Sequence, residues 1–203
     1  TYISLNLLSD GETYLSGLSR NTRQQYRRHL RRLGDQGDVR TSVETEPDGV
    51  EKRLQEAMVN HDTWWGEGPR ADWFGREATR RFTIDGARLL AKRGQYLAYT
   101  LDLDKTPIAW NFGAFDGRRY FEHLLSHNPE YRAHSPGATL TLSLIQELIE
   151  RGASRVEFGP GDHQRKRSAG GMARQHVRFV WYRGWLRSAA RLRGALRGRP
   201  RSA

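Results

Sequence analysis

The chain has 203 residues, a length that is enough for one domain with a hydrophobic core, and 28% of the residues are charged. Its 34 Lys and Arg outnumber its 23 Asp and Glu, and the net charge of +11 favours polyanionic partners: nucleic acid, anionic lipid or phosphorylated small molecules. The absence of cysteine excludes disulfides, thiolate nucleophiles and cysteine-ligated metals, and no apolar run is long enough to span a bilayer.

The N-terminal segment predicts a strand over 2–7 and a helix capped by Ser9, since Glu12 stands three residues beyond it. No basic region precedes the apolar residues at the start, so no signal peptide is predicted. We therefore expect a cytoplasmic protein without an integral membrane segment. The start also lacks a Met, which indicates a piece of a longer chain.

A long basic helix is predicted over 19–33. Its apolar stripe is narrow, and arginines cover the rest of its surface: Arg20, Arg23, Arg27, Arg28, Arg31 and Arg32. This surface is either an ordinary solvated face or a contact surface for a phosphate-rich partner. Alternation over 39–45 then predicts a half-exposed strand.

A helix over 48–58 leads into a loop over 61–75 that is rich in large aromatic residues, Trp64, Trp65 and Trp73. They either close the edge of the core or line an acceptor or acyl pocket, because such pockets are mainly apolar. His61 and Asp62 have no further His or carboxylate at ligand spacing, so no metal site is predicted.

The middle of the chain predicts a helix over 76–92 with Phe82 turned inward, followed by three strands over 96–101, 107–115 and 118–127. Turns at 104–105 and 116–117 would join these strands into a meander. On the third strand, His123 and His127 are expected to share one face, where either is a general-base candidate or a structural residue.

The segment over 131–167 predicts a loop, a helix, a strand and a second loop. Ser135 is placed to cap the helix, and no acidic residue occupies the first turn. The N–H groups of Gly137, Ala138 and Thr139 could therefore hold a phosphate, although an ordinary capped helix that binds nothing has the same pattern. Asp162 follows the strand at the end where ligands gather in α/β sheets.

The order of several short motifs resembles the CelD-like (cellulose biosynthesis) acetyltransferases of the GNAT superfamily, which are similar to the Fem-type aminoacyltransferases. The motifs are Leu18-Ser19-Arg20-Asn21, Pro129-Glu130-Tyr131, Ser135-Pro136-Gly137 and Phe158-Gly159-Pro160-Gly161-Asp162, with Lys166 behind them. The resemblance implies a GNAT-like mixed α/β (α+β) fold over 1–183, with helices on both faces of a mixed sheet. Residues 175–182 would form its last strand, and 184–203 a basic tail.

The resemblance also implies the chemistry. Acyl-CoA, such as acetyl-CoA, would be the co-substrate, held between the helix start and a strand that splays from its neighbour, by Ser135, Gly137, Ala138, Thr139 and Leu125. Asp162 would orient the acceptor or accept its proton, Lys166 would stabilise negative charge, and His123 is the further catalytic candidate. Trp64, Trp65, Trp73 and Arg167 would bind the acceptor. Three features depart from the family: Arg165 replaces an aromatic residue, Ser168-Ala169-Gly170-Gly171 replaces a common bulky residue, and His134 replaces a tyrosine.

Three functions remain open from the sequence. The first is acyl transfer from acyl-CoA to an amine or hydroxyl of a sugar or cell-envelope precursor. The second is a Fem-like aminoacyltransferase that uses charged tRNA, in which this chain would be the C-terminal half of a tandem-GNAT protein. The third is a non-catalytic module whose basic helix and tail bind nucleic acid or an anionic surface.

Overall fold

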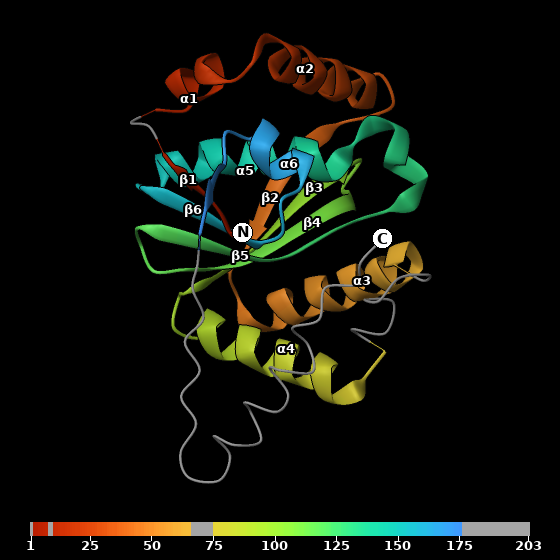
Figure 1. Ribbon diagram of the computed structural model, residues 1–203. Helices are drawn as coiled ribbons and strands as arrows, with labels where there is room; N and C mark the ends of the chain where they lie inside the picture. The colour runs from red at the N-terminus through yellow and green to blue at the C-terminus, as the bar shows by residue number, and fades with distance from the viewer. Residues whose placement is uncertain (1, 8–9, 66–74, 176–203) are drawn as a thin grey trace, which may run out of the picture.

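In the computed structural model, the described residues 2–7, 10–65 and 75–175 build one seven-stranded sheet (Figure 1). The side chains of 61–65 are not part of this description. The strand order is β2-β3-β4-β5-β6-β1-β7. Only β5 and β6 are parallel, whereas the other neighbours are antiparallel. The predicted mixed α/β fold is therefore confirmed.

Tight turns set the lengths of the central strands, as predicted. Asp104 and Lys105 have φ angles of 49° and 67° between β3 and β4, and Gly117 has a φ of 88° between β4 and β5. The strands are β1 (Tyr2–Asn6), β2 (Val39–Glu44), β3 (Tyr96–Leu103), β4 (Thr106–Phe115), β5 (Arg119–His127), β6 (Arg155–Pro160) and β7 (Met172–Arg174).

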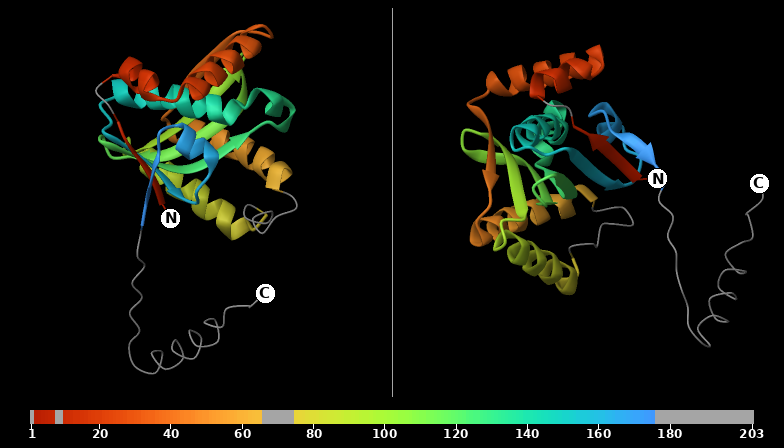
Figure 2. Two further views of the ribbon diagram at one scale, coloured as in Figure 1. Left: turned by 45° about the horizontal axis from the view of Figure 1, so that its top comes forward. Right: turned by 90° about the vertical axis from the view of Figure 1, so that its left-hand side faces the viewer.

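Helices cover both faces of the sheet (Figures 1 and 2). One face carries α5 (Pro136–Glu150), with α1 (Gly11–Gly17) and α2 (Arg20–Gly34) packed on α5 as an outer layer, and the opposite face carries α3 (Pro47–Trp65) and α4 (Glu77–Ala91). The short η1 (Pro129–His134) and α6 (Gln164–Ser168) flank α5 in sequence. Each face has its own hydrophobic core, and the predicted stripe of α5 is buried: Leu140, Leu144, Ile145, Leu148 and Ile149.

The helices α1 and α2 both begin at a side-chain cap. Helix α2 begins at Arg20, one residue later than predicted, and Ser19 caps it, because its Oγ accepts the Thr22 N–H at 3.1 Å. In α1 the cap is Asp10 instead of Ser9, since Asp10 Oδ1 accepts the Thr13 N–H at 2.7 Å. Asp and Ser are equally good caps, so the residue types alone could not decide between Ser9 and Asp10.

Two predictions for the helical face were wrong. The helix expected over 48–58 continues to Trp65, so the residues from His61 to Trp65 belong to α3 and not to a loop. Phe82 is exposed, because the buried side of α4 carries the small residues Ala87 and Ala91 instead.

Three further predictions lie outside the described residues and stay predictions. They concern Trp73, the strand over 175–182 beyond its first residue, and the domain boundary at 183. Among the residues that the structure does describe, no helix has the length and apolar character needed to cross a bilayer.

Candidate active site

The start of α5 lies where the sequence predicts, but its cap differs. Ser135 has a left-handed backbone (φ 47°, ψ 50°), and its side chain makes no capping hydrogen bond. The N–H groups of Ala138 and Thr139 both donate to the Ser135 carbonyl, at 3.0 and 3.1 Å. The N–H groups of Ala138 and Thr139 therefore already have partners within the first helical turn. Of the three N–H groups predicted to hold a phosphate, the one of Gly137 remains.

Strand β5 contains a β-bulge at His123. Phe112 of β4 pairs with Leu124, and the next residue, Gly113, pairs with Glu122, so His123 is the additional residue in β5. A bulge locally disrupts the ladder, bends the strand and redirects side chains, and bulges are frequent beside active sites.

The bulge places the two histidines of β5 on opposite faces of the sheet, so the prediction of a shared face was wrong. His123 Nδ1 lies 2.9 Å from the Tyr96 hydroxyl, which belongs to the core on the α3–α4 side. His127 lies on the other side, where its Nδ1 is 3.9 Å from the position that a Cβ on Gly137 would occupy. Desolvation by the surrounding protein lowers the pKa of both imidazoles below the ordinary value, and Arg132 adds to the effect at His127.

Strands β5 and β6 separate shortly after they begin to pair. Their parallel pairing covers only Arg119–Phe121 against Arg155–Glu157. Within the described residues, the part of β5 beyond Phe121 has no partner on β6, which is the splay that the resemblance implies. Leu125 lies on this part of β5, with its side chain 3.5 Å from the position of a Cβ on Gly137.

A polar network lies at the point where the two strands separate. Arg165 of α6 forms a bidentate ion pair with Glu122 of β5, at 2.6 and 3.0 Å, and Arg165 also donates to Thr141 Oγ1 at 3.0 Å. Asn111 of β4 donates to the same carboxylate at 2.9 Å. Glu122 had no role in the sequence prediction. The sequence did contain a signal for this ion pair, namely a carboxylate in a central strand. Such a group is rarely buried without a cationic partner.

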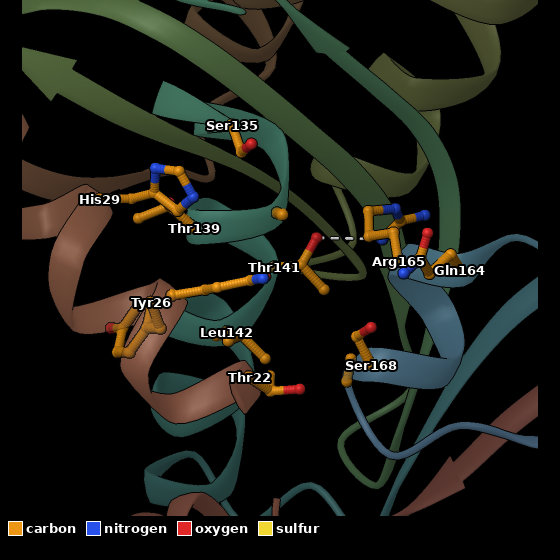
Figure 3. Close-up of a pocket in the computed structure, with 13 residues that line it drawn as sticks. Thr22, Tyr26, His29, Ser135, Thr139, Thr141, Leu142, Gln164, Arg165 and Ser168 are labelled. Carbon is orange, nitrogen blue, oxygen red and sulfur yellow. Dashed lines mark hydrogen bonds between the residues drawn. The ribbon is translucent and has the colours of Figure 1, made fainter. Parts of the chain in front are cut away.

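A cavity of about 270 Å³ lies between α2, α5 and α6 (Figure 3). Three of the predicted cofactor-binding residues line it, Ser135, Ala138 and Thr139, whereas Gly137 and Leu125 face the space between α5 and β5. Helix α2 supplies a wall that the sequence prediction did not include, with Tyr26 and His29 among its side chains. The cavity therefore borders the start of α5 on the side of the basic helix.

Several polar atoms around this cavity are buried without a hydrogen-bond partner in the described residues. They are Thr139 Oγ1, His29 Nδ1 and His134 Nδ1, and Thr139 is only 2% exposed. Burial lowers the pKa of His29, and the positive charges of Arg28 and Arg32 and the neighbouring His134 lower it further. Buried polar groups normally have partners, so these atoms keep hydrogen-bonding capacity that a polar ligand or an ordered water could use.

The structure places the two predicted catalytic residues Asp162 and Lys166 in different surroundings. Asp162 pairs with Arg167 at the surface, and this hydrogen-bonded guanidinium lowers the pKa of the carboxyl. Lys166 is 5% exposed, and its Nζ donates to the carbonyls of Gly159 and Pro160 at 3.3 and 2.7 Å. None of the three charged side chains lines the cavity. These contacts hold Lys166 against the end of β6, because a buried ammonium must find acceptors.

The side chains of the other substrate-binding candidates, Trp64, Trp65 and Trp73, lie outside the described residues, so their role stays a prediction. Among the described residues, no group of three or more His, Cys, Asp or Glu is arranged to hold a metal ion.

Comparison with protein families gives one match: the model of the acetyltransferase (GNAT) domain matches residues 20–167. No curated protein matches the sequence.

Solved structures share the fold at low sequence identity. FemX superposes with a TM-score of 0.62 at 14% identity, over 84% of this chain and 58% of its own. A conserved protein of unknown function from Bacteroides thetaiotaomicron has a TM-score of 0.55 at 15% identity, over 85% and 56%. An aminoglycoside acetyltransferase from an uncultured soil metagenomic sample, in complex with sisomicin, has a TM-score of 0.50 at 12% identity, over 71% and 95%. The chain thus spans just over half the length of the first two.

Proposed function

Because the chain belongs to the acetyltransferase (GNAT) domain family, we propose that it transfers an acyl group from acyl-coenzyme A to an amine or hydroxyl acceptor. One observation carries this proposal: β5 leaves β6 beyond Phe121, beside a cavity at the start of α5. The separated strands would accommodate the extended thioester arm, and the cavity would accommodate the phosphates. A sugar or cell-envelope precursor is the proposed acceptor, and the CelD-like resemblance stays a prediction.

The residues around the cavity fit a phosphorylated donor. The Gly137 amide lies in the first turn of α5, where the helix dipole favours an anion. Thr139 Oγ1 and His29 Nδ1 make no hydrogen bond to the described residues, so both could bond to a ligand. We therefore propose that Ser135, Gly137 and Thr139 bind the diphosphate, with His29 as an added contact from α2.

His123 is the proposed general base. Its lowered pKa keeps the imidazole neutral near pH 7, so it can accept a proton from an incoming amine. The Tyr96 hydroxyl at 2.9 Å would orient the ring. In this proposal Asp162, paired with Arg167, contributes to the rim of the acceptor site, whereas Lys166 supports β6.

Calorimetric titration with coenzyme A and acetyl-coenzyme A tests the donor. We expect binding with a Kd between about 1 µM and 1 mM, the usual range of substrate affinities. Absence of binding up to millimolar concentrations would overturn the proposal. Transfer is then measured as thiol release with a panel of amino sugars, where His123→Ala should lower turnover and leave coenzyme A affinity unchanged.

The exposed arginines of α2 favour a second candidate, a Fem-like enzyme that uses charged tRNA. Gel-shift titration with charged tRNA separates the two. Binding to tRNA together with failure to bind coenzyme A would support this second candidate. Equal, strongly salt-dependent binding to tRNA and to unrelated DNA would instead indicate a non-catalytic polyanion-binding module.

A further inference from the structure

Helix α2 presents an unusual concentration of uncompensated positive charge. It contains six arginines and no acidic residue between Arg20 and Gly34. Five of them are exposed and form no ion pair with a described carboxylate: Arg20, Arg27, Arg28, Arg31 and Arg32. Some exposed arginines elsewhere do have such partners, as in the pairs of Arg81 with Glu77 and of Arg119 with Asp116.

Two of these arginines stand next to residues that line the cavity. Gln25 and His29 line it, and Arg28 and Arg32 each follow one of them by three positions. Both arginines therefore lie on the adjoining stripe of α2, which forms the rim of the cavity, and their charges act on the His29 ring. Residues four apart stand on one face of a helix, with Cβ atoms about 5–6 Å apart, so the two can contact one anion together. Arg27 and Arg31 are each rotated by about 100° from this face.

The cavity therefore offers two kinds of anion contact at two depths. Inside it, the contacts are neutral and buried: the first turn of α5, Thr139 Oγ1 and the His29 ring. At its rim, the contacts are the exposed guanidinium groups of Arg28 and Arg32. Coenzyme A also carries two phosphate groups, a diphosphate next to the arm that bears the thioester and a monophosphate on the adenosine ribose. The diphosphate is the nearer of the two to the arm in the β5–β6 gap, which leaves the monophosphate for the rim.

Building on the proposed acyl-coenzyme A donor, we propose that Arg28 and Arg32 bind the 3′-phosphate of its adenosine. Helix α2 would then be the element that distinguishes a 3′-phosphorylated donor from a donor without this phosphate. Guanidinium groups suit the role, because they bind phosphate in bidentate geometry and keep their charge at any physiological pH.

Calorimetry with coenzyme A and with dephospho-coenzyme A tests this inference on the unmodified chain. We expect coenzyme A to bind about tenfold more tightly, since charge-assisted hydrogen bonds to one phosphate are of that strength. The double variant Arg28→Ala/Arg32→Ala should bind the two ligands with equal affinity and should retain the affinity of the unmodified chain for dephospho-coenzyme A.

The matched control is Arg27→Ala/Arg31→Ala, which removes two exposed charges at the same spacing from the same helix. It should keep the tenfold preference. Equal affinities for the two ligands in the unmodified chain would overturn the assignment of α2 while leaving the acyl-coenzyme A donor in place. A preference that survives in Arg28→Ala/Arg32→Ala, or that the control also loses, would overturn it as well. Failure of both ligands to bind the unmodified chain would instead remove the donor proposal, and this inference with it.

Discussion

Arg165 and Glu122 face each other across the place where the sheet opens, 43 positions apart in the chain, with their side chains only 19% and 7% exposed. Arg165 belongs to α6 and Glu122 to β5, so the pair ties the helix that follows β6 to the strand that leaves it. Asn111 and Thr141 complete the hydrogen bonds of the two charges. A largely buried ionic contact therefore joins α6 to β5 at the point where β5 leaves β6.

Removing one partner of this pair should destabilise the fold strongly. Glu122→Ala leaves the Arg165 guanidinium partly buried without its counter-charge, and we expect the free energy of unfolding to fall by about 3 kcal/mol. Urea denaturation measures the change. A loss below about 1 kcal/mol would mean that the pair behaves like an exposed one.

Two further variants make the result specific to burial. Glu77→Ala breaks the pair of Glu77 with Arg81, whose side chains are 70% and 77% exposed, and should cost under about 0.5 kcal/mol. Glu122→Leu/Arg165→Met replaces both charges with apolar groups and should recover most of the stability that Glu122→Ala loses.

Two buried threonines of α5 should respond oppositely to the same substitution. Thr139→Val removes a hydroxyl without a partner in the described residues, so stability should stay equal or rise by about 1 kcal/mol, while coenzyme A affinity falls about tenfold. Thr141→Val removes a hydroxyl that donates to the Gly137 carbonyl at 2.8 Å and accepts from Arg165, and should cost about 1–3 kcal/mol. Thermal unfolding and calorimetry measure both effects. A stability loss in Thr139→Val equal to that in Thr141→Val would contradict the orphaned state of the Thr139 hydroxyl.

Gly113 should not tolerate a side chain. A Cβ there would lie 2.4 Å from the Tyr120 ring and 2.6 Å from the Phe121 carbonyl, directly opposite the bulge. We expect Gly113→Ala to lower the free energy of unfolding by about 1–3 kcal/mol through overpacking. Gly86→Ala is the control, because nothing lies within 4 Å of its Cβ position and alanine favours the helix, so stability should rise by about 0.5–1 kcal/mol. Equal effects of the two substitutions would show that β4 can shift away from Tyr120.

Mild acid should weaken the fold through its histidines. In the folded chain, burial lowers the pKa values of His123 and His127 below the ordinary value of 6.5. Just below pH 6.5 the unfolded chain therefore binds more protons than the folded chain. The contribution of the two histidines to the free energy of unfolding is complete above about pH 6.5 and declines as the pH falls. Urea unfolding between about pH 7.5 and about pH 5.5 should show the decline, and the slope should be shallower in His123→Gln/His127→Gln. A stability that increases on acidification, or an unchanged slope in the variant, would disprove the assignment.

The local features of the fold could be predicted from sequence because each depends on neighbouring residues. The periodic apolar side chains of α5 and the Gly117 turn are such features, and both are present. The bulge at His123 could not be predicted, because one inserted residue in a strand leaves no mark in composition. It reversed the expected faces for every residue beyond it, including His127.

Within the candidate site, too, only the features that depend on neighbouring residues could be predicted. The position of the α5 start follows from Pro136 and Gly137, which act locally. The burial of Lys166 and the pairing of Glu122 depend on backbone carbonyls and side chains that only the folded sheet brings together. The wall supplied by α2 has the same origin, since His29 and Thr139 are more than a hundred positions apart.

The place of β1 in the sheet has a consequence for biosynthesis. Tyr2–Asn6 lies between β6 and β7, and its first neighbour in space, Arg155–Pro160, is translated about 150 residues later. At roughly 5–20 residues per second, the ribosome needs on the order of ten seconds to deliver that neighbour. During this time the nascent β1 lacks both of its partner strands, so its part of the sheet can form only after β6 has left the exit tunnel.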